Sequence, residues 1–304
     1  MSRRRAAAGL AALVIVVVAA GGCGDSDEPA APDRFDEQRA YADVQGQLAF
    51  GPRPTGSAGN ARNARFIADE LEKAGAEDVE IQSPYANVVG TIPGSEPGAV
   101  VVGAHHDTKD IPGFLGANDG ASGVAVVLEL ARALAAEAPL DGPSMHLALF
   151  DAEEARGERP FETDGTRGSR QYVKLAEGGG KQGSPPLDEI EAMALFDLVG
   201  DCALEIPLES GSDPALYALF ADAATERTGE AAPFVGTTTP IGDDHIPFTE
   251  AGIPAVDLID LAFGDGPSPG SYWHTLEDTL DKVCAESLDA VGEAAVVAVP
   301  QIGG

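Results

Sequence analysis

Hydrophobic positions along the chain follow two alternating patterns, which together predict an α/β fold. Some stretches have apolar residues at helical spacing, such as Phe66, Ile67 and Leu71. Others are short apolar or β-branched runs between turn residues, as in strands. We expect helices over 35–49, 61–74, 121–138, 167–175, 214–227 and 276–297, and strands over 79–82, 87–92, 99–104, 145–150, 192–199 and 255–259. This alternation predicts three α/β/α layers, with helices on both faces of a central, mostly parallel mixed sheet.

The first 22 residues differ from the rest of the chain. Three arginines, Arg3 to Arg5, precede an apolar run that is short for a membrane span and ends in two glycines before Cys23. This pattern predicts a secretory signal peptide over residues 1–22, and a small-residue site before a cysteine resembles a bacterial lipoprotein signal. The alternative is a plain cleaved signal. We expect an exported protein that is either secreted or anchored to the cell surface by a lipid on Cys23.

The segment after the signal is polar, and the remainder has the length of one domain. Residues 23–34 are acidic and rich in proline, which suits a tether rather than a core. Residues 35–304 suffice for one large α/β domain and are short for two. We therefore expect a single folded domain, which we take to be monomeric and in contact with a membrane only through the Cys23 lipid.

Charge and cysteine content narrow the function classes. The formal net charge is −31, which argues against nucleic-acid binding. Three cysteines occur, and with Cys23 assigned to the anchor, Cys202 and Cys284 remain as a pair in an oxidising compartment. The sequence leaves open whether they form a disulfide. Neither belongs to a close cysteine cluster, so thiolate ligation of zinc is not expected.

Polar side chains follow the apolar runs at the points where the predicted strands end. In an open α/β sheet, ligands bind beyond the carboxyl ends of the strands. The residues at these points are His105, His106, Asp107, Asp151, Glu153, Glu154, Asp197, Trp273 and His274, and Asp119 directly precedes a predicted helix. We expect them to meet at one edge of the sheet.

Each candidate has a structural explanation when it is taken alone. Asp119 could cap the helix that follows it, His274 could be a packed histidine, and the Glu153–Glu154 pair could be a solvated loop. Asp197, however, lies in an apolar run and needs a partner or a metal to compensate for its desolvation. Together, histidine nitrogens and carboxylate oxygens without thiolates favour a catalytic zinc site.

Two neighbours of these candidates have roles of their own. When one carboxylate of an adjacent pair binds a metal, the other can move protons at the activated group. Asp107, two residues after His105, could hold that imidazole as a partner that does not itself bind the metal. The remaining histidines, His106, His146 and His245, are expected to be structural, with His245 capping or packing a short helix in DDHIPF.

The order of motifs resembles the zinc-dependent aminopeptidase family that also contains the animal-type glutaminyl cyclases. The motifs are GAHHDT, GANDGASG, FDAEEA, GSR, FDLVG, DDHIPF and YWHTLEDTLD, and the similarity runs from about residue 35 to the end. The resemblance implies a single zinc-enzyme catalytic domain over residues 35–304. In the aminopeptidases, two zinc ions are held at positions that match His105, Asp119, Glu154, Asp197 and His274, with Asp119 bridging the ions.

The cyclases of this family hold one zinc, at the positions of Asp119, Glu154 and His274. The resemblance gives Glu153 the role of proton shuttle. It also implies that Asp197 and Asp243 serve the reaction and that Trp273 lines the substrate pocket.

Particular positions bear on the choice between the two branches. The Asp243–Asp244 doublet looks closer to the cyclases, since the aminopeptidases more often carry a small hydroxyl residue at the position of Asp243. The chain departs from the animal cyclases at Asp257, where they have a histidine, and at Arg159, where they have a second pocket tryptophan.

We expect a zinc-dependent glutaminyl-peptide cyclotransferase, which converts the N-terminal glutamine of peptides or proteins to pyroglutamate and releases ammonia. The alternative is a zinc aminopeptidase with one or two zinc ions, since all five two-metal positions are filled. A third hypothesis is a non-catalytic, peptide-binding lipoprotein, but such a binder would have no use for both Glu153 and Glu154.

Overall fold

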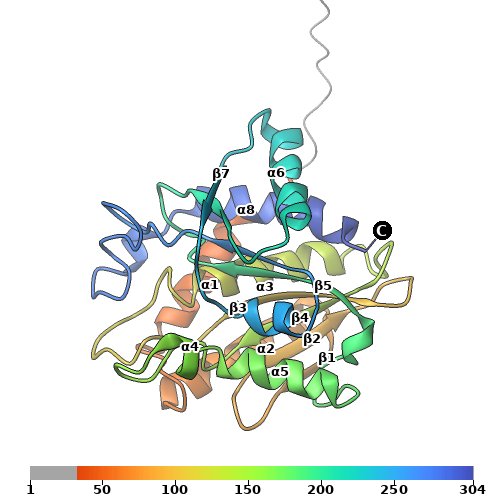
Figure 1. Ribbon diagram of the computed structural model, residues 1–304, viewed down its shortest axis with the longest axis horizontal. Coiled ribbons are helices and arrows are strands. Elements are labelled where there is room, and N and C mark those ends of the chain that lie inside the picture. Colours follow the sequence, from red (N-terminus) through yellow and green to blue (C-terminus); the bar gives the residue numbers. More distant parts are fainter. Residues whose placement is uncertain (1–32, 304) are drawn as a thin grey trace, which may run out of the picture. The chain divides into compact units, whose positions relative to one another are not determined.

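The computed structural model describes residues 33–303, which fold around a central sheet with helices on both faces (Figure 1). The predicted signal peptide over 1–22, Cys23 and residues 24–32 of the predicted tether lie outside the described residues. Within 33–303, no helix combines the length and apolar character needed to cross a membrane.

The main sheet has six strands in the order β1-β2-β4-β3-β5-β8. Their bounds are Glu77–Ile81 (β1), Val88–Ile92 (β2), Ala99–His105 (β3), Ser144–Phe150 (β4), Ile190–Asp197 (β5) and Ala255–Ile259 (β8). Strands β4, β3, β5 and β8 are parallel, whereas β2 is antiparallel to both β4 and β1. The predicted mixed and mostly parallel sheet is therefore confirmed.

Burial of the central strands on both faces explains their continuous apolar sequences. Every residue of β3 is buried, as is typical of a parallel strand that is covered by helices on both sides. The carboxyl ends of β3, β4 and β5 lie at one edge because these strands run in the same direction. This arrangement brings together the polar residues that follow each strand.

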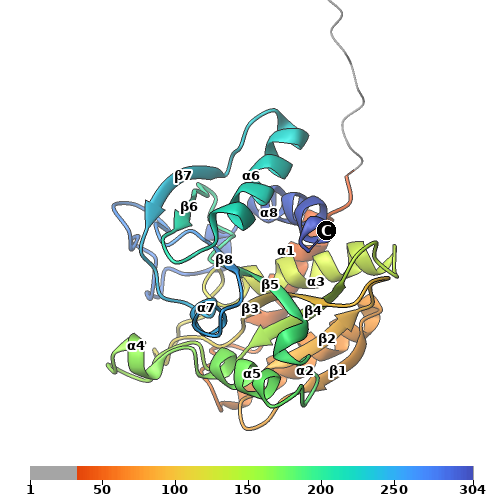
Figure 2. The ribbon, with the colours of Figure 1, turned by 45° about the vertical axis from the view of Figure 1, so that its right-hand side comes forward.

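Helices cover the two faces of the sheet unequally. The larger core lies against α1 (Glu37–Leu48), α2 (Ala58–Ala74), α3 (Ser122–Ala135), α6 (Pro214–Thr228) and α8 (Ala285–Ala298). The opposite face packs against α5 (Arg167–Glu177) and the short α7 (Ile246–Glu250). Figure 2 shows α3 and α8 on one side of the strands and α5 and α7 on the other. A further short helix, α4 (Phe161–Asp164), lies in the loop after β4.

Local chemistry fixes where two of these helices begin. The Ser57 side chain accepts a hydrogen bond from the backbone nitrogen of Asn60 at 3.0 Å, so α2 begins at Ala58, earlier than the predicted residue 61. At the start of α3, a Cβ on Gly123 would lie 2.0 Å from the carbonyl oxygen of Phe196. Glycine therefore lets the first turn of α3 approach β5 closely, which places Asp119 beside the ends of the strands.

The helix predicted over 276–297 begins too early, because α8 starts at Ala285. Before it lie turns and a single 3-10 turn, η2 (Leu280–Lys282). Val283 forms a β-bridge with Asp201, and Asp278 accepts hydrogen bonds from a distant loop. These tertiary contacts outweigh the local helical pattern.

A small second sheet was not predicted. It pairs β6 (Ile206–Glu209) with β7 (Phe234–Thr239) in parallel. Most of β7 is exposed, and its sequence FVGTTT has too few apolar residues to mark a strand by pattern alone. Glu209, at the end of β6, lies close to the chemistry described below.

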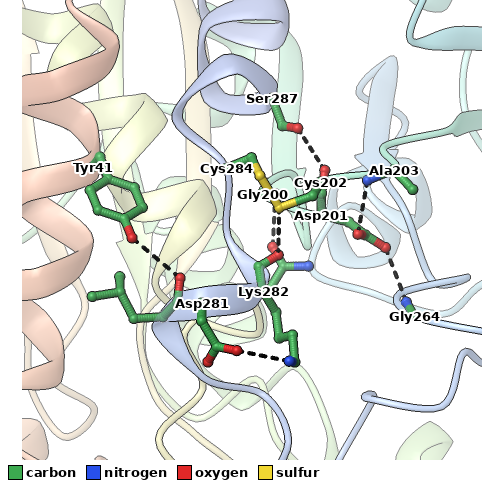
Figure 3. The surroundings of a disulfide bond; sticks show 12 residues. Tyr41, Gly200, Asp201, Cys202, Ala203, Gly264, Asp281, Lys282, Cys284 and Ser287 are labelled. Atoms are coloured by element: carbon green, nitrogen blue, oxygen red, sulfur yellow. Dashed lines mark hydrogen bonds and ion pairs between the residues drawn. A yellow bond between two sulfur atoms is a disulfide. The ribbon is translucent and has the colours of Figure 1, made fainter.

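Cys202 and Cys284 form a disulfide across 82 residues, which answers the question that the sequence left open. Next to it, the Asp201 carboxylate accepts a hydrogen bond from the Gly264 backbone at 3.0 Å, and the Ser287 hydroxyl donates to the Asp201 carbonyl at 2.6 Å (Figure 3). The bond joins the segment after β5 to the start of α8.

Candidate active site

A cavity of about 310 Å³ lies beyond the carboxyl ends of β3, β4 and β5. Candidates from six separate sequence motifs line it: His105, Asp119, Glu153, Glu154, Asp197, Asp243, Trp273 and His274. His105 and Asp197 are the last residues of their strands, β3 and β5. The structure therefore brings these eight residues to one edge of the sheet, whereas His106, Asp107 and Asp151 do not line the cavity. The Asp151 carboxylate instead accepts hydrogen bonds from the backbone nitrogens of Ala86 at 3.0 Å and Ala152 at 2.8 Å.

The first group of ligating atoms is centred on His105. Its Nε2 lies 3.1 Å from Asp197 Oδ1 and 3.4 Å from Asp119 Oδ1. All three side chains are largely buried. The ligating atoms lie within 4.8 Å of one another, close enough to hold a single ion.

The second group is centred on His274. Its Nε2 lies 3.0 Å from Glu154 Oε1 and 3.3 Å from Asp119 Oδ2. These atoms also lie within 4.8 Å of one another. Asp119 thus presents one carboxylate oxygen to each group, as a bridging ligand does.

The donors in these groups fit a metal ion such as zinc. They are imidazole nitrogens and carboxylate oxygens, and Asp119 Oδ2 is buried without a hydrogen-bond partner. Five carboxylates line the cavity, namely Asp119, Glu153, Glu154, Asp197 and Asp243. Within residues 33–303 the lining lysine and arginine residues are Lys109 and Arg159, so carboxyl groups outnumber these cations, which suits a bound metal ion.

Glu153 is held beside the second group by a buried carboxylate. Asp107 accepts hydrogen bonds from the backbone nitrogens of Glu153 at 3.1 Å and Glu154 at 3.4 Å. Its Oδ1 lies 3.8 Å from His105 Nδ1, which is too long for a hydrogen bond. Asp107 nevertheless faces the His105 imidazole within ion-pair distance, so its role as an outer partner of His105 stays a prediction. Asp107 also fixes the backbone of the Glu pair.

The environment of Glu153 favours its protonated form. Its side chain is buried, and this burial raises the pKa of Glu153 well above its ordinary value, as does the negative charge of Glu154. A carboxyl group with a raised pKa is suited to accepting and returning a proton near neutral pH.

His274 is held in an uncommon backbone conformation. Its φ is 54°, in the left-handed region, which costs a non-glycine residue about 1–3 kcal/mol. The Trp273 ring stacks on the imidazole with centroids 3.8 Å apart, and Phe114 contacts it edge-on at 6.2 Å. Aromatic packing thus orients the imidazole, and Trp273 also lies in the cavity wall, where the sequence placed it.

Asp243 contributes another buried carboxyl group to the cavity. Its Oδ2 has no hydrogen-bond partner within residues 33–303. Burial raises the pKa of Asp243 well above its usual range, and the charges of Asp257 and Asp197 add to this effect. A neutral Asp243 can donate a hydrogen bond to a neighbouring carboxylate or to a substrate.

Behind Asp243, a histidine lies between two carboxylates. His245 Nε2 is 3.1 Å from Glu209 Oε2, and His245 Nδ1 is 3.5 Å from Asp257 Oδ2. His245 makes no capping hydrogen bond at the start of α7. The chain therefore has a carboxylate at 257, where the animal cyclases have a histidine, and an imidazole from another element beside it. Sequence reasoning missed Glu209 because β6 was not predicted.

Three further residues support the site and were not singled out from the sequence. Arg53 is fully buried and donates to the carbonyl oxygens of Leu115 at 2.7 Å and Gly116 at 2.9 Å, just before Asp119. Lys109 Nζ lies 3.0 Å from Glu154 Oε2.

The third of these residues, Asp278, accepts hydrogen bonds from the backbone nitrogens of Asn118 and Asp119. It lies within the motif YWHTLEDTLD, and its place in that motif is the feature of the sequence by which it could have been found.

The remaining two histidines lie away from the metal-ligating groups. His106 Nε2 contacts the carbonyl oxygen of Ala86 at 3.0 Å, and His146 Nε2 contacts Thr91 Oγ1 at 3.0 Å. Neither lines the cavity. Their structural roles agree with the sequence analysis.

Comparison with known proteins identifies the family. The sequence profile of peptidase family M28 matches residues 87–299. The glutaminyl-peptide cyclotransferase of Drosophila melanogaster is 28% identical over 279 residues, which cover 76% of this chain and 72% of the relative.

Solved structures with the same fold include both cyclases and peptidases. The glutaminyl cyclase of an Acidobacteriales bacterium superposes with a TM-score of 0.77 at 31% identity, covering 92% of this chain and 99% of that one. A Zn-dependent exopeptidase from Parabacteroides distasonis superposes with a TM-score of 0.73 at 25% identity, covering 87% of this chain and 97% of that one. The profile match extends over most of the chain, and the chain therefore belongs to peptidase family M28.

Proposed function

We propose that this protein is a zinc-dependent glutaminyl-peptide cyclotransferase, which converts the N-terminal glutamine of peptides to pyroglutamate and releases ammonia. The observation that carries the proposal is the buried Glu153 carboxyl beside the Asp119–Glu154–His274 group, in one cavity with Asp243. Similarity to cyclases in both sequence and structure supports it.

In this proposal Asp119, Glu154 and His274 hold the zinc ion. Zinc bound there supplies a Lewis acid that polarises the γ-carbonyl of the substrate glutamine. His274 is oriented for ligation by its stacking on Trp273, and Asp119 by the hydrogen bond from its backbone to Asp278. His105 and Asp197 then remain as the opposite wall of the cavity.

Glu153 transfers the proton during cyclisation. The α-amine of the substrate forms a bond to the γ-carbon, and the bond from that carbon to the amide nitrogen breaks. Glu153 accepts a proton from the attacking amine and returns it to the leaving nitrogen, which departs as ammonia. Its raised pKa suits both transfers. Asp197 stabilises the positive charge that develops on the reacting amine, and Asp243 keeps the proton-transfer network in place by hydrogen bonding in the same cavity.

The cavity wall favours cyclisation over hydrolysis by limiting access of water. Apolar side chains line much of the rest of the cavity: Phe161, Ile241, Ile259, Leu261 and Trp273. A substrate that fills this space displaces the water that would otherwise compete with its own amine.

A zinc aminopeptidase is the second candidate, and one observation favours it. His105, Asp119 and Asp197 form a complete second group of ligands that shares Asp119 with the first. With two zinc ions, Glu153 would act as the general base for an attacking water. The similarity to a Zn-dependent exopeptidase agrees with this possibility.

Two assays on the zinc-loaded protein separate these functions. Gln-peptide amides are followed for ammonia and for a pyroglutamyl product, and amino-acid anilides are followed for release of the aniline. We expect ammonia and pyroglutamate, with slow anilide cleavage and about one zinc ion per chain. Free amino acids without ammonia, together with two zinc ions per chain, would establish the aminopeptidase instead.

We also propose that the protein is exported, held at the cell surface through a lipid on Cys23, and monomeric. The Cys202–Cys284 disulfide supports an oxidising compartment. Mass spectrometry of the mature N-terminus tests the anchor: an acylated Cys23 is expected, and loss of acylation in Cys23→Ser should release the protein from membranes. Size-exclusion chromatography with light scattering tests the monomer.

A further inference from the structure

Three arginines between the end of β4 and the first turn of α5 converge on one carboxylate. Asp164, in α4, forms ion pairs with Arg156 Nη2 at 2.5 Å, Arg159 Nη1 at 3.0 Å and Arg167 Nη1 at 3.1 Å. Over residues 156–167 the three arginines are matched in number by Glu158, Glu162 and Asp164. Of these carboxylates, only Asp164 forms ion pairs with the arginines.

Among the three, only Arg159 lines the cavity. Its side chain is 59% exposed, which places it at the rim rather than in the interior. Nη1 is held by Asp164, whereas Nε and Nη2 donate no hydrogen bond to any residue in 33–303. Arg159 is thus anchored at one nitrogen and has donors available for a ligand.

The other cation in the cavity wall is already engaged. Lys109 is 16% exposed, and its Nζ lies 3.0 Å from Glu154 Oε2. Arg159 is therefore the lining cation that can pair with a charged substrate. The carboxylates deeper in the cavity would repel an anionic substrate group, so such a group fits only at the rim.

We propose that Arg159 determines specificity by binding an acidic side chain on the residue that follows the N-terminal glutamine. This inference rests on the proposed cyclase function, in which the glutamine occupies the inner cavity beside Glu153. One extended residue spans roughly 3.3–3.6 Å, so the second residue extends outward toward the rim. A guanidinium group binds a carboxylate through two parallel hydrogen bonds, which favours Glu or Asp over neutral or basic residues.

The test compares substrates that differ only at the second position. Gln-Glu-Ala-amide, Gln-Gln-Ala-amide and Gln-Lys-Ala-amide have side chains of comparable length with negative, neutral and positive charge. We expect kcat/KM for Gln-Glu-Ala-amide to exceed that for Gln-Gln-Ala-amide by about threefold to tenfold, mainly through KM. Added salt should reduce this preference, because the pair is partly exposed.

Two substitutions at Arg159 and one matched control locate the effect. Arg159→Gln should equalise the Glu and Gln substrates, and Arg159→Glu should make the Lys substrate the preferred one. Arg156→Gln is the control, since Arg156 pairs with the same Asp164 but does not line the cavity, and it should keep the preference for Glu.

The outcomes separate this inference from the proposed function. Equal cyclisation of all three peptides by the unmodified enzyme, or an undiminished Glu preference in Arg159→Gln, overturns the role of Arg159 and leaves the cyclase function intact. Formation of no pyroglutamate from any peptide overturns the cyclase function and this inference with it. Because each peptide ends in an amide, it has no terminal carboxylate that could bind Arg159. A preference for the Glu peptide that appears only when the peptides have a free C-terminus also overturns recognition of the side chain.

Discussion

The Asp278 carboxylate accepts a hydrogen bond from the backbone nitrogen of Asp119 at 3.1 Å, although 159 residues separate the two along the chain. Its other oxygen accepts from the backbone nitrogen of Asn118 at 2.8 Å. We expect Asp278→Ala to lower zinc affinity by about 10–100-fold, because the loop that presents Asp119 loses both acceptors. Competition with a chelator of known affinity measures the change.

The control for this prediction is Asp281→Ala. Asp281 is exposed, and within residues 33–303 its side chain pairs only with the neighbouring Lys282 and Thr279. It belongs to neither group of metal-ligating residues. The zinc affinity of the Asp281→Ala variant should match that of the unmodified protein. An equal loss of zinc affinity in Asp278→Ala and Asp281→Ala would show that both substitutions act by disturbing the fold of this segment, and that the contact between Asp278 and Asp119 is not the cause.

Glu153→Gln is expected to abolish most activity without removing the metal. Glutamine keeps the shape of the side chain but cannot accept the proton, so kcat should fall by about 100–10,000-fold. Zinc content should remain unchanged, because Glu153 belongs to neither ligand group. Steady-state kinetics and metal analysis on the same sample test this prediction, and activity within tenfold of the unmodified enzyme would contradict the role of Glu153.

Replacing both cysteines by alanine is expected to destabilise the fold. The disulfide closes a loop of 82 residues, and its removal increases the entropy of the unfolded chain by an amount worth about 2–4 kcal/mol. Urea unfolding of the Cys202→Ala/Cys284→Ala variant gives this difference. Addition of a reductant should lower the stability of the unmodified protein to a similar value and leave the variant unaffected.

His146 is expected to make stability depend on pH. Burial lowers the pKa of His146 to about 4, from 6.5 for an exposed histidine. Below pH 6.5 the unfolded chain therefore binds a proton that the folded chain does not, and stability falls as the pH drops from 6.5 toward 4. Between pH 7 and pH 5 this contributes a loss of about 2 kcal/mol.

The test compares the unmodified protein with His146→Gln, in which the amide can still hydrogen-bond to Thr91. Free energies of unfolding are measured in urea at both pH values. The variant should lose about 2 kcal/mol less than the unmodified protein over this interval. Identical pH dependence would mean that other groups control the acid sensitivity.

Much of the fold could be predicted because buried strands and helices have recognisable patterns of apolar residues in the sequence. Strand β3 is buried on both faces and therefore reads as a continuous apolar run, and polar residues mark where β3 and β5 end. Strand β7 is mostly exposed, and its sequence therefore has no continuous apolar run that would predict a strand. The segment before α8 has a helical pattern but is held in turns by contacts with Asn118, Asp119 and Asp201.

The sequence by itself determined the α/β class, the sheet edge at which the chemistry lies, and the residues that meet there, because these follow from periodicity and strand direction. Only the tertiary structure decided which groups touch: Asp107 accepts a hydrogen bond from the Glu153 backbone, and His245 lies between Glu209 and Asp257. It also showed that Arg159 lines the cavity with donors available. Periodicity reports whether a residue is buried, whereas its partners depend on how distant segments pack.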